Sequence, residues 1–184
     1  VPVVSFNMAG LESNPGFKIT PAMGKRLLLA VMYGDLFQRL LYATRPYEEV
    51  PGAAEGIMKK YEAAIFENCR DGNFSTYKQL VQEIVRDYDT MPLRRIKKPR
   101  VGVVGEILVK YHPDANNNIV DIIEKEGGEA VVLDLIDFFL YGMYSKKFNY
   151  ENLSGTYQQY KLNQAAIALV EQFRRPLRKA LRQS

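Results

Sequence analysis

The residues with the most evident chemistry lie in one short stretch, RVGVVGEILVKYHPDANNN, over residues 100–118. It contains the carboxylate of Glu106, the ammonium of Lys110, the chain's only histidine, His112, and three asparagines at 116–118. The stretch begins with apolar, β-branched residues typical of a buried strand and ends with polar residues typical of a helix start. Ligands of open parallel sheets bind beyond the strand ends, near helix N-termini that favour anions. The stretch therefore predicts a small-ligand site.

The opening segment VPVVSFN is also apolar and β-branched, and we expect it to form a second buried strand that ends at Asn7. If the two strands are parallel, Asn7 lies at the same sheet edge as Glu106. The asparagines can then hydrogen-bond a carbonyl or amide, and Glu106 can bind a ligand or act as an acid or base. The alternative is structural: Asn116 caps the helix and Glu106 is solvated or ion-paired. The residues expected to line the cleft are Asn7, Glu106, Lys110, Asn116 and Asn117.

Other kinds of site find little support in the sequence. His112 has no second histidine at helical spacing and no cysteine neighbour, so we expect it at the surface rather than on a metal. The single cysteine, Cys69, excludes an internal disulfide framework and cannot form a cysteine-rich metal site alone. The GVVGE segment differs from the dinucleotide-binding fingerprint, and no phosphate-loop motif occurs. We therefore predict neither a metal nor autonomous nucleotide binding.

Composition sets the outer limits. The chain has 184 residues, of which 47% are apolar and 25% charged, enough for one sizeable core. No apolar run approaches the roughly 20 residues of a spanning helix, and the N-terminus lacks a basic leader, so we expect a soluble, cytoplasmic protein. The net charge of +4 is concentrated at 94–100 and 174–182. Basic patches of this kind can attract nucleic acid, but they are more often solvated faces of linkers and helices. We therefore expect no nucleic-acid partner.

The elements that position the predicted site are helices and a crossover. Thr20 and Pro21 are typical of a helix start, and Arg45-Pro46 of a helix end. Within the first helix, Asp35 and Arg39 have the spacing of a surface ion pair. The segment RVGVVGEI, a short helix and the segment EAVVLDL form a β-α-β unit of about 100–135, which we expect to be right-handed and parallel. We expect a helical subregion over about 21–90, with helices at about 21–44, 53–70 and 74–88. A final helix is expected at about 155–182, with Ser154 as its N-cap.

Together these elements predict a single α/β domain over residues 1–184. Its expected architecture is a Rossmann-like open parallel sheet flanked by helices, with an additional helical subregion. Because the chain starts directly in a predicted core strand, we expect it to be an excised piece of a larger protein.

Three segments resemble a known family: VPVVSFNMAGLESNPGF, YGDLFQRLLYATRPYE and RVGVVGEILVKYHPDANNNIVDIIEKEGGEAVVLDLIDFFLY. In this order they are similar to the dehydratase-like region of large fused CoA-substrate-specific enzyme activases. That region is related to the 2-hydroxyacyl-CoA dehydratases and the D-component of 2-hydroxyglutaryl-CoA dehydratase. The resemblance implies Rossmann-like lobes, a cysteine-held iron–sulfur cluster, and ATP-driven one-electron chemistry that removes water from a 2-hydroxyacyl-CoA.

The chain departs from that family in lacking the cluster cysteines and the phosphate-binding motif of the ATPase. On the resemblance, the cluster and ATP belong to other parts of a full-length protein, and the piece is catalytically silent by itself. We therefore expect a scaffold lobe whose partners are the remaining domains of the parent chain, a dehydratase or activase, and an acyl-CoA. The alternatives are a stand-alone ligand-binding or regulatory module in which 100–118 holds a phosphate or carboxylate, and an interaction module that uses the basic final helix.

Overall fold

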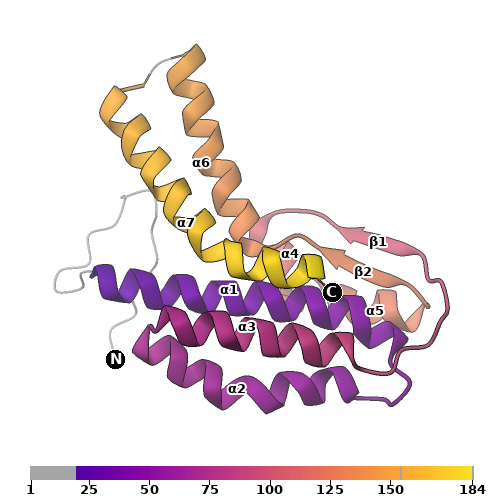
Figure 1. Cartoon of the computed structure of the whole chain (residues 1–184). Coiled ribbons are helices and arrows are strands. Elements are labelled where there is room, and N and C mark those ends of the chain that lie inside the picture. The colour runs from indigo at the N-terminus through magenta and orange to yellow at the C-terminus, as the bar shows by residue number, and fades with distance from the viewer. Residues whose placement is uncertain (1–19, 154, 184) are drawn as a thin grey trace, which may run out of the picture.

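A computed structural model describes residues 20–153 and 155–183 (Figure 1). Its elements follow in the order α1 (Pro21–Thr44), the 3-10 turn η1 (Arg45–Tyr47), α2 (Ala53–Asp71), α3 (Phe74–Asp89), β1 (Arg100–Val103), α4 (Ile107–Tyr111), the 3-10 turn η2 (Pro113–Ala115), α5 (Ile119–Lys125), β2 (Glu129–Val132), α6 (Leu135–Asn152) and α7 (Tyr157–Gln183). About three quarters of the described residues, 75%, are helical.

The first three helices begin and end at local signals that the sequence carries. Thr20 accepts a hydrogen bond from the Met23 amide at 3.2 Å, and Pro21 occupies the first helical position. Gly72, at φ 69°, ends α2, and the Asn73 side chain accepts from the first amides of α3. The predicted helices at 21–44, 53–70 and 74–88 are confirmed to within one residue. Beyond Thr44 the chain passes directly into η1.

The core lies among the helices. In Figure 1, α2 and α3 run beside α1, and the C-terminal half of α7 returns across α1. Three tyrosines are almost completely buried in this bundle: Tyr33, Tyr77 and Tyr88. Their hydroxyls donate to Asn68 Oδ1 at 2.8 Å, to the Phe173 carbonyl at 3.0 Å and to the Ala54 carbonyl at 2.8 Å, respectively. Each ring therefore contributes apolar packing while its one polar group stays bonded.

The two strands pair in parallel at one end of the bundle. Arg100 lies opposite Glu129, and Val103 lies opposite Val132. The connection between the strands runs through α4, η2 and α5, so the predicted parallel β-α-β unit is confirmed. One side of β2 faces the C-terminal half of α1, from Gln38 to Ala43.

The predicted Rossmann-like open sheet is wrong. The described residues contain two strands of four residues each, and the main cluster of buried apolar side chains comes from the helices. The strand in the segment RVGVVGEI ends at Val103. The next residue, Val104, is 82% exposed, and Gly105 turns the backbone with a φ of 147° before α4 begins. A sheet this small cannot supply a core, so it is attached to a helical bundle. The strand predicted at Val1–Asn7 lies outside the described residues.

Helices α6 and α7 form an antiparallel hairpin that projects away from the bundle (Figure 1). The segment IDFFLYGMYSKKF lies within α6. Helix α7 begins at Tyr157, two residues later than predicted, and the predicted cap Ser154 lies outside the described residues. The base of the hairpin contacts α1 and α3, so its attachment depends on that end.

Candidate functional site

Glu106 serves as a helix cap. Its side chain accepts a hydrogen bond from the Leu108 amide at 2.9 Å, at the start of the five-residue helix α4. The residue is exposed and does not line the cavity described below. The structural alternative for Glu106 therefore explains its contacts, with the carboxylate compensating unpaired amides at a helix start.

The three asparagines have distinct local roles. Asn116 accepts from the Ile119 amide at 3.2 Å and donates to the Val109 carbonyl at 2.9 Å, so it ties α5 to α4. Asn117 and Asn118 have φ values of 56° and 55°, a left-handed conformation that asparagine tolerates better than most residues. The run of asparagines thus makes a turn, and Asn116 acts as the cap that the sequence suggested as the structural alternative.

The structure brings together only part of the predicted cleft. Lys110 and Asn116 line one cavity, whereas the exposed Glu106 and Asn117 do not contribute to it. Asn7 lies outside the described residues. His112 is exposed, and within residues 20–153 and 155–183 no group of three or more histidine, cysteine, aspartate or glutamate side chains is arranged to hold a metal.

The cavity that contains Lys110 lies between α1 and the segment from 110 to 121. Its volume is about 210 Å³. Aromatic walls come from Tyr42 and Tyr111, and the Lys110 ammonium lies 5.4 Å from the centre of the Tyr111 ring. The polar groups around the cavity are those of Gln38, Arg45, Lys110, Asn116, Asn118 and Asp121.

Arg45 lies in the wall of this cavity, but its guanidinium is already bound by carboxylates of the protein. Its guanidinium donates to both carboxylate oxygens of Glu124, at 2.8 and 3.0 Å, and to Asp121 at 3.2 Å. Glu55 lies at 3.4 Å from a third nitrogen. These carboxylates hold the pKa of Arg45 above its usual value despite partial burial. The cluster ties the end of α1 to α5.

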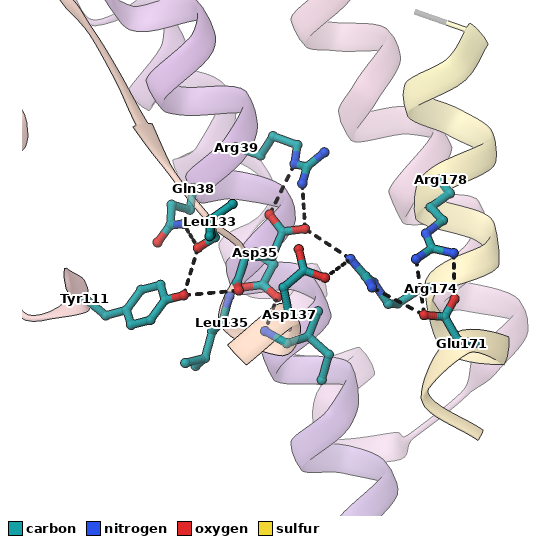
Figure 2. A network of polar contacts seen from close by, with 12 residues as sticks. Asp35, Gln38, Arg39, Tyr111, Leu133, Leu135, Asp137, Glu171, Arg174 and Arg178 are labelled. Atoms are coloured by element: carbon teal, nitrogen blue, oxygen red, sulfur yellow. Dashed lines mark hydrogen bonds and ion pairs between the residues drawn. The ribbon is translucent and has the colours of Figure 1, made fainter. Parts of the chain in front are cut away.

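A second polar cluster, which we call the clasp, lies where β2 ends and α6 begins (Figure 2). Asp35 of α1 accepts hydrogen bonds from the Leu135 and Ile136 amides at 2.7 and 3.0 Å. Tyr111 donates to the carbonyls of Leu133 and Asp134. In an open α/β fold this strand end would receive an anionic ligand, but here the chain's own carboxylate takes that position.

Two arginines complete the clasp around Asp134, the residue before α6. Arg39 of α1 binds both oxygens of Asp134, at 2.7 and 3.2 Å. Arg174 of α7 lies 2.8 Å from Asp137 and 3.6 Å from Asp134. Asp134 and Arg174 are buried, with 2% and 6% of their surfaces exposed. The clasp therefore joins α1, α6 and α7 through charge-assisted hydrogen bonds around the buried Asp134.

Burial changes the proton affinities in the clasp. It raises the pKa of Asp35 from 3.8 to about 6, against the lowering effect of the two α6 amides, and the charges of Asp134 and Asp137 act in the same direction as burial. Burial also raises the pKa of Tyr111 to about 12. For Cys69, which is half-buried in α2, burial raises the thiol pKa and so lowers its thiolate fraction at neutral pH.

The clasp corrects two expectations. Asp35 and Arg39 do not pair with each other; each instead binds the start of α6 or the residue before it. Arg174, expected on a solvated face, is buried. The helical spacing of Asp35 and Arg39 was the only local signal, because their partners lie about 95 to 101 residues away in the sequence.

Comparisons with known proteins give no relative: the chain matches no family model, no curated protein and no solved structure. None of the described helices is long and apolar enough to cross a membrane.

Proposed function

We propose that this chain is a scaffold lobe of a longer, acyl-CoA dehydratase-like protein of the activase type. In that protein, ATP-driven one-electron activation or 2-hydroxyacyl-CoA dehydration is carried out by other domains, and this chain holds them in position. The family in this proposal rests on the sequence resemblance alone, and the observation that carries the scaffold role is a stripe of exposed aromatic side chains on α6, which we call the aromatic stripe.

The aromatic stripe consists of four residues that lie along one side of the hairpin. Phe138, Tyr141, Tyr144 and Phe148 are 42%, 75%, 50% and 58% exposed. Their spacings of three, three and four residues place them on one face of the helix. Exposed apolar groups that gather on one face, rather than lie singly, are typical of a surface that another protein covers.

The clasp supports the same proposal because it fixes the base of the hairpin. Asp35 and Arg39 hold the start of α6 to α1, and Arg174 holds α7 to the same point. A projecting hairpin with a rigid base presents its outer face at a defined angle.

The iron–sulfur cluster that the resemblance implies does not fit the residues described. Cys69 is a single half-buried thiol whose pKa burial raises, whereas clusters need several cysteine thiolates. We therefore assign no step through a cluster to this chain. In this proposal the other domains of the longer protein determine which acyl-CoA is the substrate.

The test is anaerobic reconstitution with iron and sulfide, performed on this chain alone and together with the remaining domains of the longer protein. We expect iron and visible absorption only where the other domains are present, and association of the chain with them. A stoichiometric cluster on this chain alone would contradict the proposal.

The aromatic stripe is tested in the same reconstitution. The triple variant Tyr141→Ser, Tyr144→Ser, Phe148→Ser should keep the circular dichroism and urea midpoint of the chain but lose association with the other domains. Lys146→Ser, an exposed change on the same helix, is the matched control and should associate normally. Equal association of the triple variant and the control would contradict a role for the stripe.

A further inference from the structure

The cavity beside Lys110 differs from the clasp because several of its polar groups have no partner in the protein. Across the part of the chain that the structure describes, Lys110 makes no ion pair, and neither the Asn118 amide nor the Tyr42 hydroxyl makes a side-chain hydrogen bond. Asp121 uses one oxygen to accept from Arg45, which leaves the other available. These groups line the cavity together and can bind a molecule inside it.

The charges around the cavity select the kind of molecule. Arg45 and Lys110 are cationic, whereas Asp121, Glu124 and Glu55 are anionic, so the cluster has a net charge of −1. A dianion such as phosphate meets no excess of positive charge here. A molecule with one ammonium and one carboxylate matches the arrangement, because Lys110 and Asp121 offer opposite charges within one cavity.

The volume indicates how much of a ligand the cavity can enclose. At about 210 Å³ the cavity is smaller than the roughly 300–1,000 Å³ typical of sites for drug-sized ligands. The cavity can enclose only part of a nucleotide or a CoA. The space suits a molecule of the size of a free amino acid.

We propose that this cavity binds a small zwitterionic amino acid. Lys110 and the Asn118 amide take its carboxylate, and Asp121 with the Tyr42 hydroxyl takes its ammonium. The Tyr42 and Tyr111 rings cover its carbon chain. This binding goes beyond the scaffold role and does not depend on it, because all the groups come from this chain.

The first experiment titrates the isolated chain with amino acids of increasing length, followed by calorimetry and by the amide NMR signals of residues 110–121. The probes are glycine, β-alanine, 4-aminobutyrate and 5-aminovalerate, which vary the distance between the two charges. Butyrate, butylamine and inorganic phosphate are the singly charged or anionic controls. We expect saturable binding of at least one zwitterion, about tenfold or more tighter than any control.

The second experiment changes each charged end separately. Lys110→Met and Asp121→Asn should each weaken binding of the best zwitterion by about tenfold or more. Lys125→Met and Asp114→Asn alter exposed charges of the same segment outside the cavity and should leave binding unchanged. Thermal unfolding of each variant confirms the fold, and Lys110→Gln replaces Lys110→Met if the methionine variant is unstable.

Three results would overturn the proposal. The first is that no zwitterion of the series binds. The second is that phosphate or butyrate binds as tightly as the best zwitterion, which would make the cavity an anion site. The third is that Lys110→Met and Asp121→Asn bind as well as their matched controls.

Discussion

The clasp and the cavity contain the same kinds of residues but use them in different ways. In the clasp, buried Arg174 and Asp134 are surrounded by opposite charges and backbone groups. In the cavity, the Lys110 ammonium lies beside the Tyr111 ring, and among the described residues no carboxylate forms an ion pair with it. Residue type therefore does not separate a structural cluster from a binding site. What separates them is whether the protein itself satisfies each polar group.

The largest effect is expected from breaking the clasp at Arg174. Arg174→Met removes the α7 partner of the half-exposed Asp137 and leaves the buried Asp134 with Arg39 as its remaining cationic partner. Removal of one partner of a fully buried pair costs about 3–5 kcal/mol, and because Arg39 stays in place we expect a loss near the lower end, about 3 kcal/mol. Urea denaturation measures the loss in the free energy of unfolding.

Arg178→Met is the matched control on the same helix. Arg178 pairs with Glu171 but is 47% exposed, so we expect a loss of about 1 kcal/mol or less. Equal losses for the two variants would show that the clasp does not depend on burial.

Asp35→Asn is expected to have the next largest effect. The amide offers one acceptor oxygen to two α6 amides, so one buried N–H loses its partner at a cost of about 1–3 kcal/mol. The free energy of unfolding is measured by urea titration.

The advantage of wild type over Asp35→Asn should also depend on pH. The folded pKa of Asp35, about 6, lies above its ordinary value of 3.8, so the folded chain binds more protons than the unfolded chain between these values. Stability from this group is therefore complete at low pH and declines as pH rises to about 6. Asp134, Asp137, Arg39, Arg174 and Tyr111 surround Asp35, and none is changed in this comparison. A pH-independent difference would contradict the raised pKa.

The fold was predictable from sequence where local signals decide it. Thr20, Gly72 and Asn73 set the ends of the first three helices, and all three are visible without a structure. The size of the sheet was not predictable, because a short apolar run such as VGVVGEI is compatible with either a strand or a helix start. Only the exposure of Val104 and the positive φ of Gly105 show that the strand ends there.

A moderate effect is expected from Glu106. Glu106→Ala removes the side-chain cap of α4, which costs about 1 kcal/mol in typical helices. Glu106→Asp keeps a carboxylate that can reach the same amide and should recover most of that loss. Denaturation in urea measures both. If Glu106→Ala were neutral for stability, the carboxylate would have a role other than the cap.

The smallest effect on stability is expected from Lys110. Lys110→Met removes no ion pair seen in the described chain, so the free energy of unfolding should change by no more than about 0.5 kcal/mol. The same variant is expected to lose amino-acid binding. A large loss of stability would mean that Lys110 belongs with the structural residues of the clasp.

The candidate site was predictable only in part. Lys110 and Asn116 were predicted correctly as cavity residues, because polar residues between a predicted strand and a predicted helix can be recognised in the sequence. Sequence position did not identify Asp35, Asp134 and Arg174 as a group, because these residues are brought together by tertiary packing across the chain. Helical spacing carried one signal for Arg174: it lies four residues after Val170 and three before Leu177, on the buried face of α7, whereas Arg175 and Lys179 do not.

The most direct test of the structural role of the clasp is a double-mutant cycle between Arg39 and Asp134, with Arg39→Met and Asp134→Asn. The two groups share bonds of 2.7 and 3.2 Å, and we expect a coupling free energy of about 1–3 kcal/mol from urea denaturation. The same cycle on Glu67 and Arg70, an exposed pair three residues apart within α2, should give about 0.5 kcal/mol or less. A coupling for Arg39 and Asp134 no larger than that of the α2 pair would contradict the account.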